Sequence, residues 1–183
     1  MAKSAWAHRP QDGNGPVSRL YLLRHAKAGW ALPGVRDFDR SLEASGVADA
    51  EAMGAAMRAG GHVPDLTLCS NARRCRQTLE GIAGHADTGR VLFFDKLYTE
   101  DAAGYLATVR EHGSAGSLLV IGHNPMTEDL ATALAGGGCA QALETLAHGF
   151  PTCGLAVIRF ETDLAAAAPG AGRLEDFLVP TSL

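Results

Sequence analysis

The sequence contains little that would suit a nucleic-acid or membrane partner. It has 16 lysine and arginine residues against 20 aspartate and glutamate residues, which gives a formal net charge of -4. Polyanionic partners favour clustered basic residues, so we expect no nucleic-acid partner. No apolar run is long enough to cross a bilayer, and residues 1–17 contain no apolar core of a signal peptide. We therefore expect no membrane partner and a cytoplasmic location.

Cysteine is scarce, and its spacing matches no metal or redox motif. The chain has no Cys-x-x-Cys pair and no zinc-type pattern with histidine; its cysteines are Cys69, Cys75, Cys139 and Cys153. This spacing favours free thiols in a reducing compartment and no structural metal. The sequence also lacks a Walker-type glycine loop, and no Gly-x-Ser-x-Gly elbow surrounds Ser70. These absences argue against a P-loop NTPase and a serine hydrolase.

The length and apolar content allow one well-buried core. At 183 residues and 46% hydrophobic content the chain is too short for two comfortable domains. Residues 1–17 are rich in glycine, proline and polar types, which predicts a flexible N-terminal arm. We expect residues 18–183 to form a single domain without internal repeats.

Short apolar runs alternate with helical patterns along the chain. The runs predict strands at 20–23, 66–69, 91–94, 118–121, 155–160 and 173–179. Apolar residues at helical spacing predict helices over 43–59, 78–82, 101–111, after Pro125, and over 141–147. This alternation predicts an α/β fold of three layers, α/β/α, around a mainly parallel sheet. The loop at 165–172 is hairpin-like, so one of the last two strands is expected to be an antiparallel edge strand.

Three segments with cationic or imidazole side chains follow predicted strands. Arg24-His25 ends the first strand, residues 70–78 follow the second, and residues 122–125 follow the fourth. In an open parallel sheet, ligands bind in the crevice outside the carboxyl ends of the strands, so these segments should converge. Two imidazoles and several guanidiniums in one crevice suit a phosphoryl group.

Four residues in these segments are candidates for phosphoryl chemistry. Arg24 and Arg74 are assigned to a clamp, because a guanidinium is always charged and its planar fork matches two phosphate oxygens. His25 is the candidate nucleophile, and nearby guanidiniums should lower its pKa from the usual ~6.5 and keep it neutral. His123 is expected to act as a charged donor to a phosphate oxygen or the leaving atom. An isolated arginine is usually a solvated surface residue, so the assignment depends on all four residues occurring together.

The three segments resemble the signature of the histidine phosphatase superfamily, in its small, phosphohistidine-phosphatase-like branch, over most of residues 19–160. Arg24-His25 matches the family's Arg-His-Gly element, with Ala26 in place of glycine. Residues 70–78 resemble its Ser-x-x-x-Arg-Ala-x-Gln-Thr element, which places the second clamp arginine at Arg74. Residues 122–125 are similar to the segment that carries its second histidine.

The resemblance implies a phosphoglycerate mutase-like fold and a phosphohistidine intermediate at His25. It also implies a pocket formed by Arg24, Arg74 and His123, without a metal or other cofactor. The methyl group of Ala26 would crowd the phosphate loop if that position required a positive φ.

The spacing of the motifs bears on the substrate. Only 49 positions separate Arg74 from His123, which leaves little room for an inserted cap, so we expect an open pocket suited to a phosphorylated side chain of another protein. An alkoxide leaving group needs a positioned acid, whereas an imidazole leaving group needs less help. The resemblance places a candidate acid at Glu100 or Asp101, although both residues also suit the start of a helix.

The leading hypothesis is a phosphatase that removes phosphate from phosphohistidine on a partner protein, such as a histidine phosphotransfer domain. One alternative is a small-molecule phosphomonoesterase or mutase with Glu100 or Asp101 as the acid, and another is a non-catalytic phosphate-binding adaptor. Lys27, Arg73 and Asn124 are assigned to substrate binding, with Lys27 and Arg73 guiding an acidic partner to the rim unless they are simply solvated.

Overall fold

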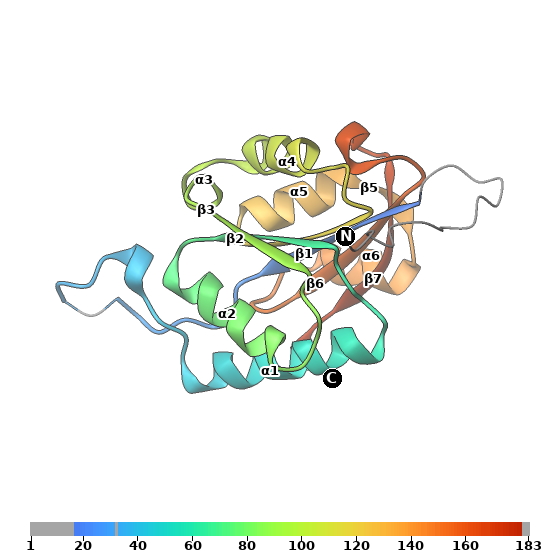
Figure 1. The fold of residues 1–183 in the computed structure, drawn as a ribbon. Helices are drawn as coiled ribbons and strands as arrows, with labels where there is room; N and C mark the ends of the chain where they lie inside the picture. Colours follow the sequence, from blue (N-terminus) through green and yellow to red (C-terminus); the bar gives the residue numbers. More distant parts are fainter. Residues whose placement is uncertain (1–16, 32, 181–183) are drawn as a thin grey trace, which may run out of the picture.

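A seven-stranded sheet with the order β3-β2-β4-β1-β6-β7-β5 forms the middle of the molecule (Figure 1). The computed structural model describes residues 17–31 and 33–180, so the expected arm at 1–17 lies outside the described residues except for its last position. The strands are β1 (Ser18–Arg24), β2 (Leu66–Ser70), β3 (Arg90–Phe94), β4 (Ser117–Gly122), β5 (Ala135–Gly138), β6 (Leu155–Phe160) and β7 (Gly172–Leu178).

Helices follow most strands, as the alternation of patterns predicts. They are α1 (Ala44–Ala59), α2 (Arg73–Ala83), α3 (Lys96–Thr99), α4 (Ala102–Glu111), α5 (Met126–Leu134) and α6 (Ala140–Ala147), with 3-10 turns η1 (Asp37–Asp39) and η2 (Leu164–Ala166). Helix α2 begins five residues before the predicted helix, which places Arg74 in its first turn. No helix in the described part of the chain is long and apolar enough to cross a bilayer.

The sheet is mainly parallel, and this fold prediction is confirmed. Strands β1, β2, β3 and β4 pair in parallel, whereas β6 runs antiparallel to both β1 and β7. Strand β6, the antiparallel strand, lies inside the sheet and not at its edge, because β7 pairs with it on the side away from β1 and β5 pairs with β7. Three of the four β5 residues are glycines, so no side-chain pattern indicated that strand.

Helices cover both faces of the sheet. Along β1, Leu20 and Leu22 pack into one core cluster, and Tyr21 and Leu23 pack into the other. Helices α1 and α2 lie on one side of the sheet and α4 and α5 on the other (Figure 1). Because successive side chains of a strand point to opposite faces, the continuous apolar run is buried on both sides.

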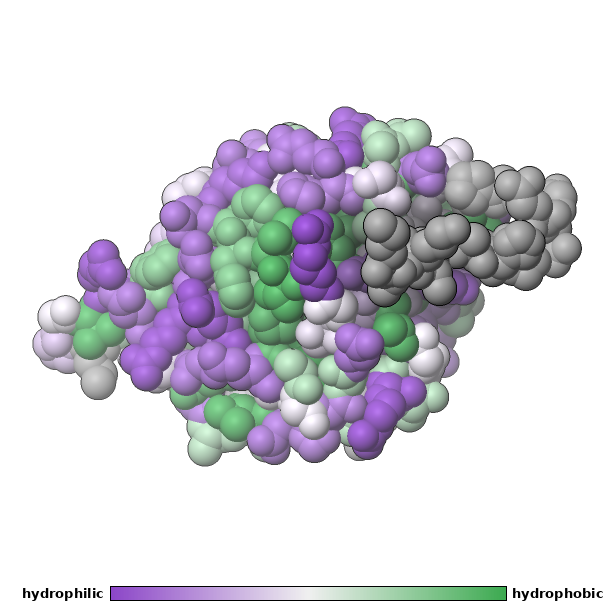
Figure 2. Space-filling model, viewed as in Figure 1, coloured by the Kyte–Doolittle hydropathy of each residue, from purple (hydrophilic) through white to green (hydrophobic). Residues whose placement is uncertain are grey.

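Strand β3 forms one edge of the sheet and is less covered than the inner strands. The side chain of Phe93 is 41% exposed there. Figure 2 shows apolar side chains in the middle of the same face, surrounded by hydrophilic ones.

Candidate active site

Three parallel neighbours, β2, β4 and β1, end at the same edge of the sheet, as predicted. The backbone N–H of His25 donates to the carbonyl of Gly122, with an N···O distance of 3.0 Å. The imidazole rings of His25 and His123 lie edge to face with their centroids 5.2 Å apart. Arg74 reaches both rings: its Nε is 3.1 Å from His25 Nε2, and its Nη2 is 3.2 Å from His123 Nδ1.

Two hydrogen bonds define the protonation state of the His25 ring. Nδ1 lies 2.8 Å from the carbonyl oxygen of Ala26, which only an N–H can satisfy. Nε2 accepts from Arg74 and therefore carries a lone pair. The pKa of His25 is lowered to about 4, first by burial and then by the charges of Arg74 and Arg24, while the Ala26 carbonyl opposes the shift. The predicted direction is confirmed, although burial contributes more than the guanidiniums.

The alanine in place of the family's glycine causes no backbone conflict. Cys153 is the single non-glycine residue with a positive φ among the described residues, so Ala26 needs no glycine conformation. The Ala26 methyl is fully buried. Its backbone N–H donates to Thr78 Oγ1 at 3.0 Å, and that hydroxyl donates to the Arg74 carbonyl at 2.7 Å. Thr78 thus connects the loop after β1 to the first turns of α2.

His123 is buried, and its ring has partners at both nitrogens. Nδ1 accepts from Arg74, and Nε2 lies 2.9 Å from the hydroxyl of Ser70. The pKa of His123 is lowered to about 3, by burial first and then by His25 and Arg74. The expectation of a charged His123 is therefore wrong for the free protein, because neither the burial nor the Arg74 contact could be deduced from spacing. A neutral ring with its hydrogen on Nε2 fits these contacts.

Arg74 has a further partner that the sequence analysis did not identify. Its Nη1 donates to the backbone carbonyl of Asp37 at 2.7 Å, and its Nη2 donates to the Asp37 carboxylate at 3.1 Å. The same carboxylate accepts from Arg40 at 2.9 Å and from the Tyr98 hydroxyl at 2.9 Å. The pKa of Asp37 is lowered to about 2, chiefly by the Arg40 hydrogen bond. The charged segment 36–40 has no helical or strand periodicity, so no sequence signal placed it here.

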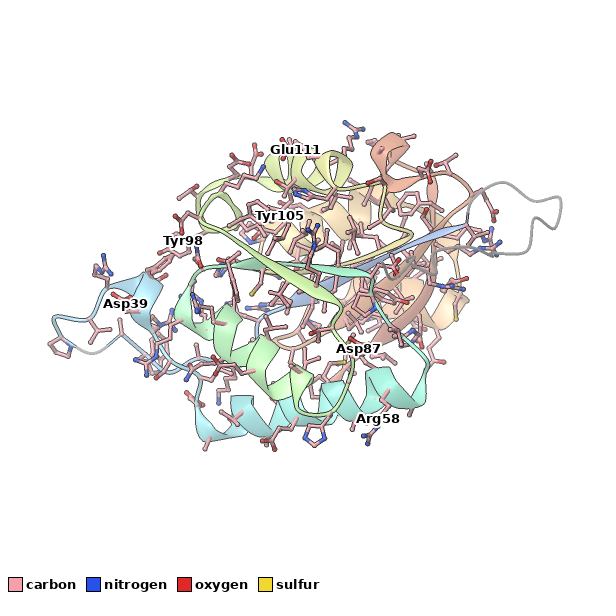
Figure 3. All side chains as sticks on the ribbon, in the orientation of Figure 1. Asp39, Arg58, Asp87, Tyr98, Tyr105 and Glu111 are labelled. Atoms are coloured by element: carbon pink, nitrogen blue, oxygen red, sulfur yellow. The ribbon has the colours of Figure 1, made fainter. Side chains whose placement is uncertain are left out.

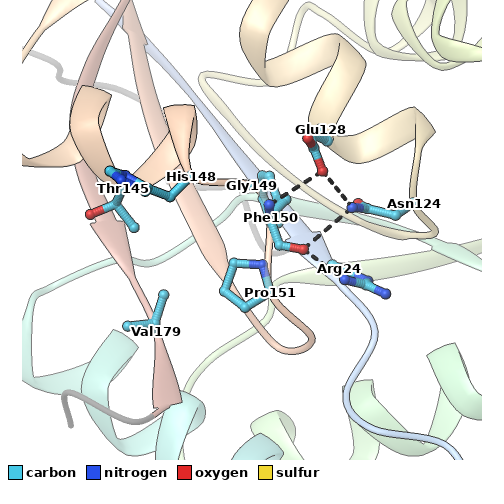
Figure 4. Close-up of a pocket in the computed structure, with 9 residues that line it drawn as sticks. All are labelled: Arg24, Asn124, Glu128, Thr145, His148, Gly149, Phe150, Pro151 and Val179. Carbon is cyan, nitrogen blue, oxygen red and sulfur yellow. Dashed lines mark hydrogen bonds between the residues drawn. The ribbon is translucent and has the colours of Figure 1, made fainter.

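Arg24 lies on the other side of the site, at a pocket of about 510 Å³ (Figure 4). Its Nη1 donates to the Phe150 carbonyl at 2.7 Å, and its buried Nε has no hydrogen-bond partner among the described residues. The amide of Asn124 donates to Glu128 at 2.8 Å, and Glu128 also accepts from the backbone N–H of Phe150. The predicted substrate-binding residue Asn124 thus lines the pocket beside Arg24. In the part of the chain that the structure describes, its buried Oδ1 also has no hydrogen-bond partner.

The remaining candidate residues are Lys27, Arg73, Glu100 and Asp101. Lys27 pairs with Glu43, with Nζ 3.0 Å from the carboxylate, and Arg73 lines a separate surface pocket. Asp101 caps the N-terminus of α4 by accepting from the Gly104 N–H, and Glu100 is exposed just before it. The described structure gives none of these four side chains a hydrogen bond or ion pair to His25, Arg74 or His123. Their roles in substrate binding and acid catalysis remain predictions.

The described residues contain no group of three or more histidine, cysteine, aspartate or glutamate side chains arranged to hold a metal ion. All four cysteines are free, and burial raises the pKa of the Cys75 thiol, which lies next to His123, to about 12. The chemistry available here is that of two neutral imidazoles, several guanidiniums and one ionised carboxylate.

Comparison with known proteins gives a consistent assignment. Residues 20–97 match the model of the histidine phosphatase superfamily (branch 1), a range that includes Arg24, His25 and Arg74 but ends before His123. An uncharacterized protein of Mycobacterium tuberculosis is 35% identical over 164 residues, which are 86% of this chain and 99% of the relative.

Two solved structures are similar along nearly their whole length. The proposed phosphohistidine phosphatase SixA from Agrobacterium tumefaciens is 38% identical, with a TM-score of 0.77, over 89% of this chain and 98% of that one. The protein described in the same way from Nakamurella multipartitia is 31% identical, with a TM-score of 0.77, over 91% of this chain and 98% of that one.

Proposed function

The chain belongs to the histidine phosphatase superfamily, and from this premise we propose that it removes phosphate from phosphohistidine on a partner protein through a phosphohistidine intermediate at His25. One observation carries the proposal: a half-buried, neutral His25 presents the Nε2 lone pair beside the Arg74 guanidinium. A neutral imidazole nitrogen is a competent nucleophile toward phosphorus.

In the first step the Nε2 lone pair of His25 forms a bond to phosphorus. The bond from phosphorus to the leaving atom breaks, and its electron pair stays on that atom. Arg74 and Arg24 stabilise the negative charge on the equatorial oxygens of the transferred group. The Ala26 carbonyl holds the Nδ1 hydrogen throughout, so Nε2 remains the reacting atom.

In the second step water attacks the phosphorus bound to His25. The electron pair of the P–N bond returns to Nε2, and both hydrogens of water leave with inorganic phosphate. His25 is restored in its starting tautomer, so no net change occurs in the protein. This division into two transfers is typical of covalent catalysis.

The acid–base groups support a phosphohistidine substrate over an alkyl phosphate. Expelling an alkoxide requires a proton donor, whereas an imidazole that carries hydrogen on its second nitrogen leaves as a neutral molecule. The Asp37 carboxylate, which accepts a hydrogen bond from Arg74, has a pKa of about 2 and holds no proton near neutral pH. Glu128, beside Arg24, accepts its two N–H hydrogen bonds on one oxygen, Oε2, from Asn124 and from the backbone of Phe150.

The relatives support the same substrate class, since two similar structures are described as proposed phosphohistidine phosphatases. A signalling phosphotransfer protein in the cytoplasm is the partner class that we propose. The pocket beside Arg24 favours one alternative, because about 510 Å³ is enough for a small phosphorylated molecule.

The test is phosphate release by the purified protein from a histidine-phosphorylated phosphotransfer domain, from para-nitrophenyl phosphate and from sugar phosphates, with His25→Ala as the control. We expect His25-dependent release from phosphohistidine and slow release from the alkyl esters. The opposite preference would move the assignment to a small-molecule phosphatase. Binding of the phosphoprotein without release from any substrate would support an adaptor.

A further inference from the structure

A carboxylate and an aromatic ring, those of Asp37 and Tyr98, lie beside the reacting residues. The Tyr98 ring packs edge to face against the His123 ring, with centroids 5.5 Å apart, and its hydroxyl donates to Asp37. The Asp37 side chain is 51% exposed even though it accepts from Arg74. In Figure 3, Tyr98 and Asp39, which stands two residues after Asp37, are labelled on the same side of the molecule.

We propose that Asp37 and Tyr98 form the binding site for the imidazole ring of the substrate phosphohistidine. Asp37 accepts the N–H of the ring nitrogen that does not carry phosphorus, and the Tyr98 ring contacts the imidazole. This inference rests on the proposed function, because it assigns residues to the leaving group of that reaction. An aromatic ring next to an exposed carboxylate suits an imidazole, which has a flat apolar body and a polar N–H.

The N–H matters because it determines what leaves. If the second nitrogen carries hydrogen, the departing imidazole keeps the electron pair of the broken P–N bond and leaves as a neutral molecule. Without that hydrogen it would leave as an anion. A carboxylate that accepts this N–H stabilises the protonated ring and so favours the first route. Asp37 removes no proton, so the step balances as one P–N bond formed at His25 and one broken at the substrate.

The protein already uses this arrangement on its own nucleophile. The Ala26 carbonyl accepts the Nδ1 hydrogen of His25 and leaves Nε2 as the reacting atom. Asp37 would do the same for the substrate ring, so the two imidazoles that exchange the phosphoryl group are held in matching ways. Donors from Arg40, Arg74 and Tyr98 keep the Asp37 carboxylate ionised, and it can therefore accept at neutral pH.

The same carboxylate discriminates against phosphate esters. An ester has no N–H to offer, so Asp37 contributes only repulsion toward its phosphate oxygens. Asp37 is therefore a specificity determinant for P–N over P–O substrates.

The experiment compares Asp37→Ala with Asp39→Ala. Asp39 lies in the same turn but pairs with Arg36, so it is the matched control. Three probes are used: a phosphohistidine peptide, the same peptide with phosphotyrosine in place of phosphohistidine, and para-nitrophenyl phosphate. Thermal unfolding of both variants checks the fold.

We expect Asp37→Ala to lower kcat/KM for the phosphohistidine peptide by about tenfold to a hundredfold, the range for a hydrogen bond to a charged group. The effects on the phosphotyrosine peptide and para-nitrophenyl phosphate should be at least about fivefold smaller, because neither leaving group offers a ring N–H. Asp39→Ala should leave all three rates near those of the wild type.

Equal losses on all three probes would overturn the inference and leave Asp37 as a positioning residue for Arg74. No loss on any probe would overturn it as well. If the wild-type protein fails to cleave the phosphohistidine peptide, the proposed function fails, and the inference fails with it. That result is visible before any variant is made.

Discussion

At the scale of single residues, Arg74 connects the two histidines to Asp37. Its guanidinium reaches His25, His123 and both the carbonyl and the carboxylate of Asp37, and it is almost fully buried. A planar fork with five N–H donors can serve several partners at fixed angles, whereas an ammonium group cannot. The geometry therefore depends on arginine and not merely on positive charge.

Arg74→Lys should lower kcat for phosphate release by about a hundredfold or more, because lysine keeps the charge but loses the fixed set of donors. The measurement is steady-state kinetics on a phosphohistidine peptide. Arg76→Lys, two residues further along the same helix but exposed, is the control and should keep its rate. Wild-type activity in Arg74→Lys would remove Arg74 from the mechanism.

His25 should titrate far below an ordinary histidine. Burial and the neighbouring guanidiniums lower its pKa to about 4, so the ring stays neutral down to moderately acidic pH. An NMR titration of the His25 ring should show its midpoint near about 4, against the usual ~6.5. Activity that depends on the free Nε2 lone pair should be lost as the pH falls through the same midpoint. A midpoint near 6.5 would contradict the proposed environment of the nucleophile.

At the scale of elements, the loop after β1 and the helix α2 meet through one hydroxyl. Thr78 Oγ1 accepts from the Ala26 N–H and donates to the Arg74 carbonyl. His25 follows β1, and Arg74 belongs to α2, which follows β2. The Thr78 hydroxyl therefore holds His25 and Arg74 in a fixed position relative to each other. This bridge could not be predicted from the sequence, because a link between residues 52 positions apart leaves no local pattern.

Thr78→Val should lower the free energy of unfolding by about 1–3 kcal/mol, because valine leaves the buried Ala26 N–H without an acceptor. It should also lower kcat, since His25 and Arg74 lose their connection. Thr67→Val is the matched control. Thr67 lies near the start of β2, away from the site, and its buried hydroxyl donates to the Thr88 carbonyl. Urea unfolding measures the free energy of unfolding of both variants, and steady-state kinetics measures their kcat. Equal kcat in the two variants would show that the bridge serves stability alone.

At the scale of the whole molecule, the order of buried strands and helices was readable from the sequence. The continuous apolar runs at β1, β2 and β4 predicted strands covered on both faces, and their polar ends predicted where the site would form. The glycine-rich strand β5 and the η1 turn gave no such signal, because neither shows hydrophobic periodicity. Asp37 and the interior position of β6 were missed for that reason.

The lowered pKa values of His25 and His123 make the stability of the whole protein depend on pH. His25 and His123 titrate at about 4 and about 3 in the folded protein, but near ~6.5 when unfolded. Between these values the unfolded state binds more protons, so stability falls as the pH is lowered below about 6.5. Each group contributes a slope of at most about 1.4 kcal/mol per pH unit.

Denaturant unfolding measured between about pH 7 and pH 4 should therefore show a stability that declines with acid. His123→Asn should flatten this decline, whereas replacement of the exposed His148 should not. An identical slope in wild type and His123→Asn would show that His123 does not drive the acid dependence.

The segment that carries Asp37 is closed at its base. Ala28 forms an antiparallel bridge with Leu42, and the Gly29 N–H donates to the Ser41 carbonyl at 3.0 Å. His25, Arg74 and His123 lie outside this closed segment, but Asp37 within it holds the Arg74 guanidinium through two hydrogen bonds. Exchange of this one loop should therefore change the proposed substrate preference and the rate of phosphoryl transfer together.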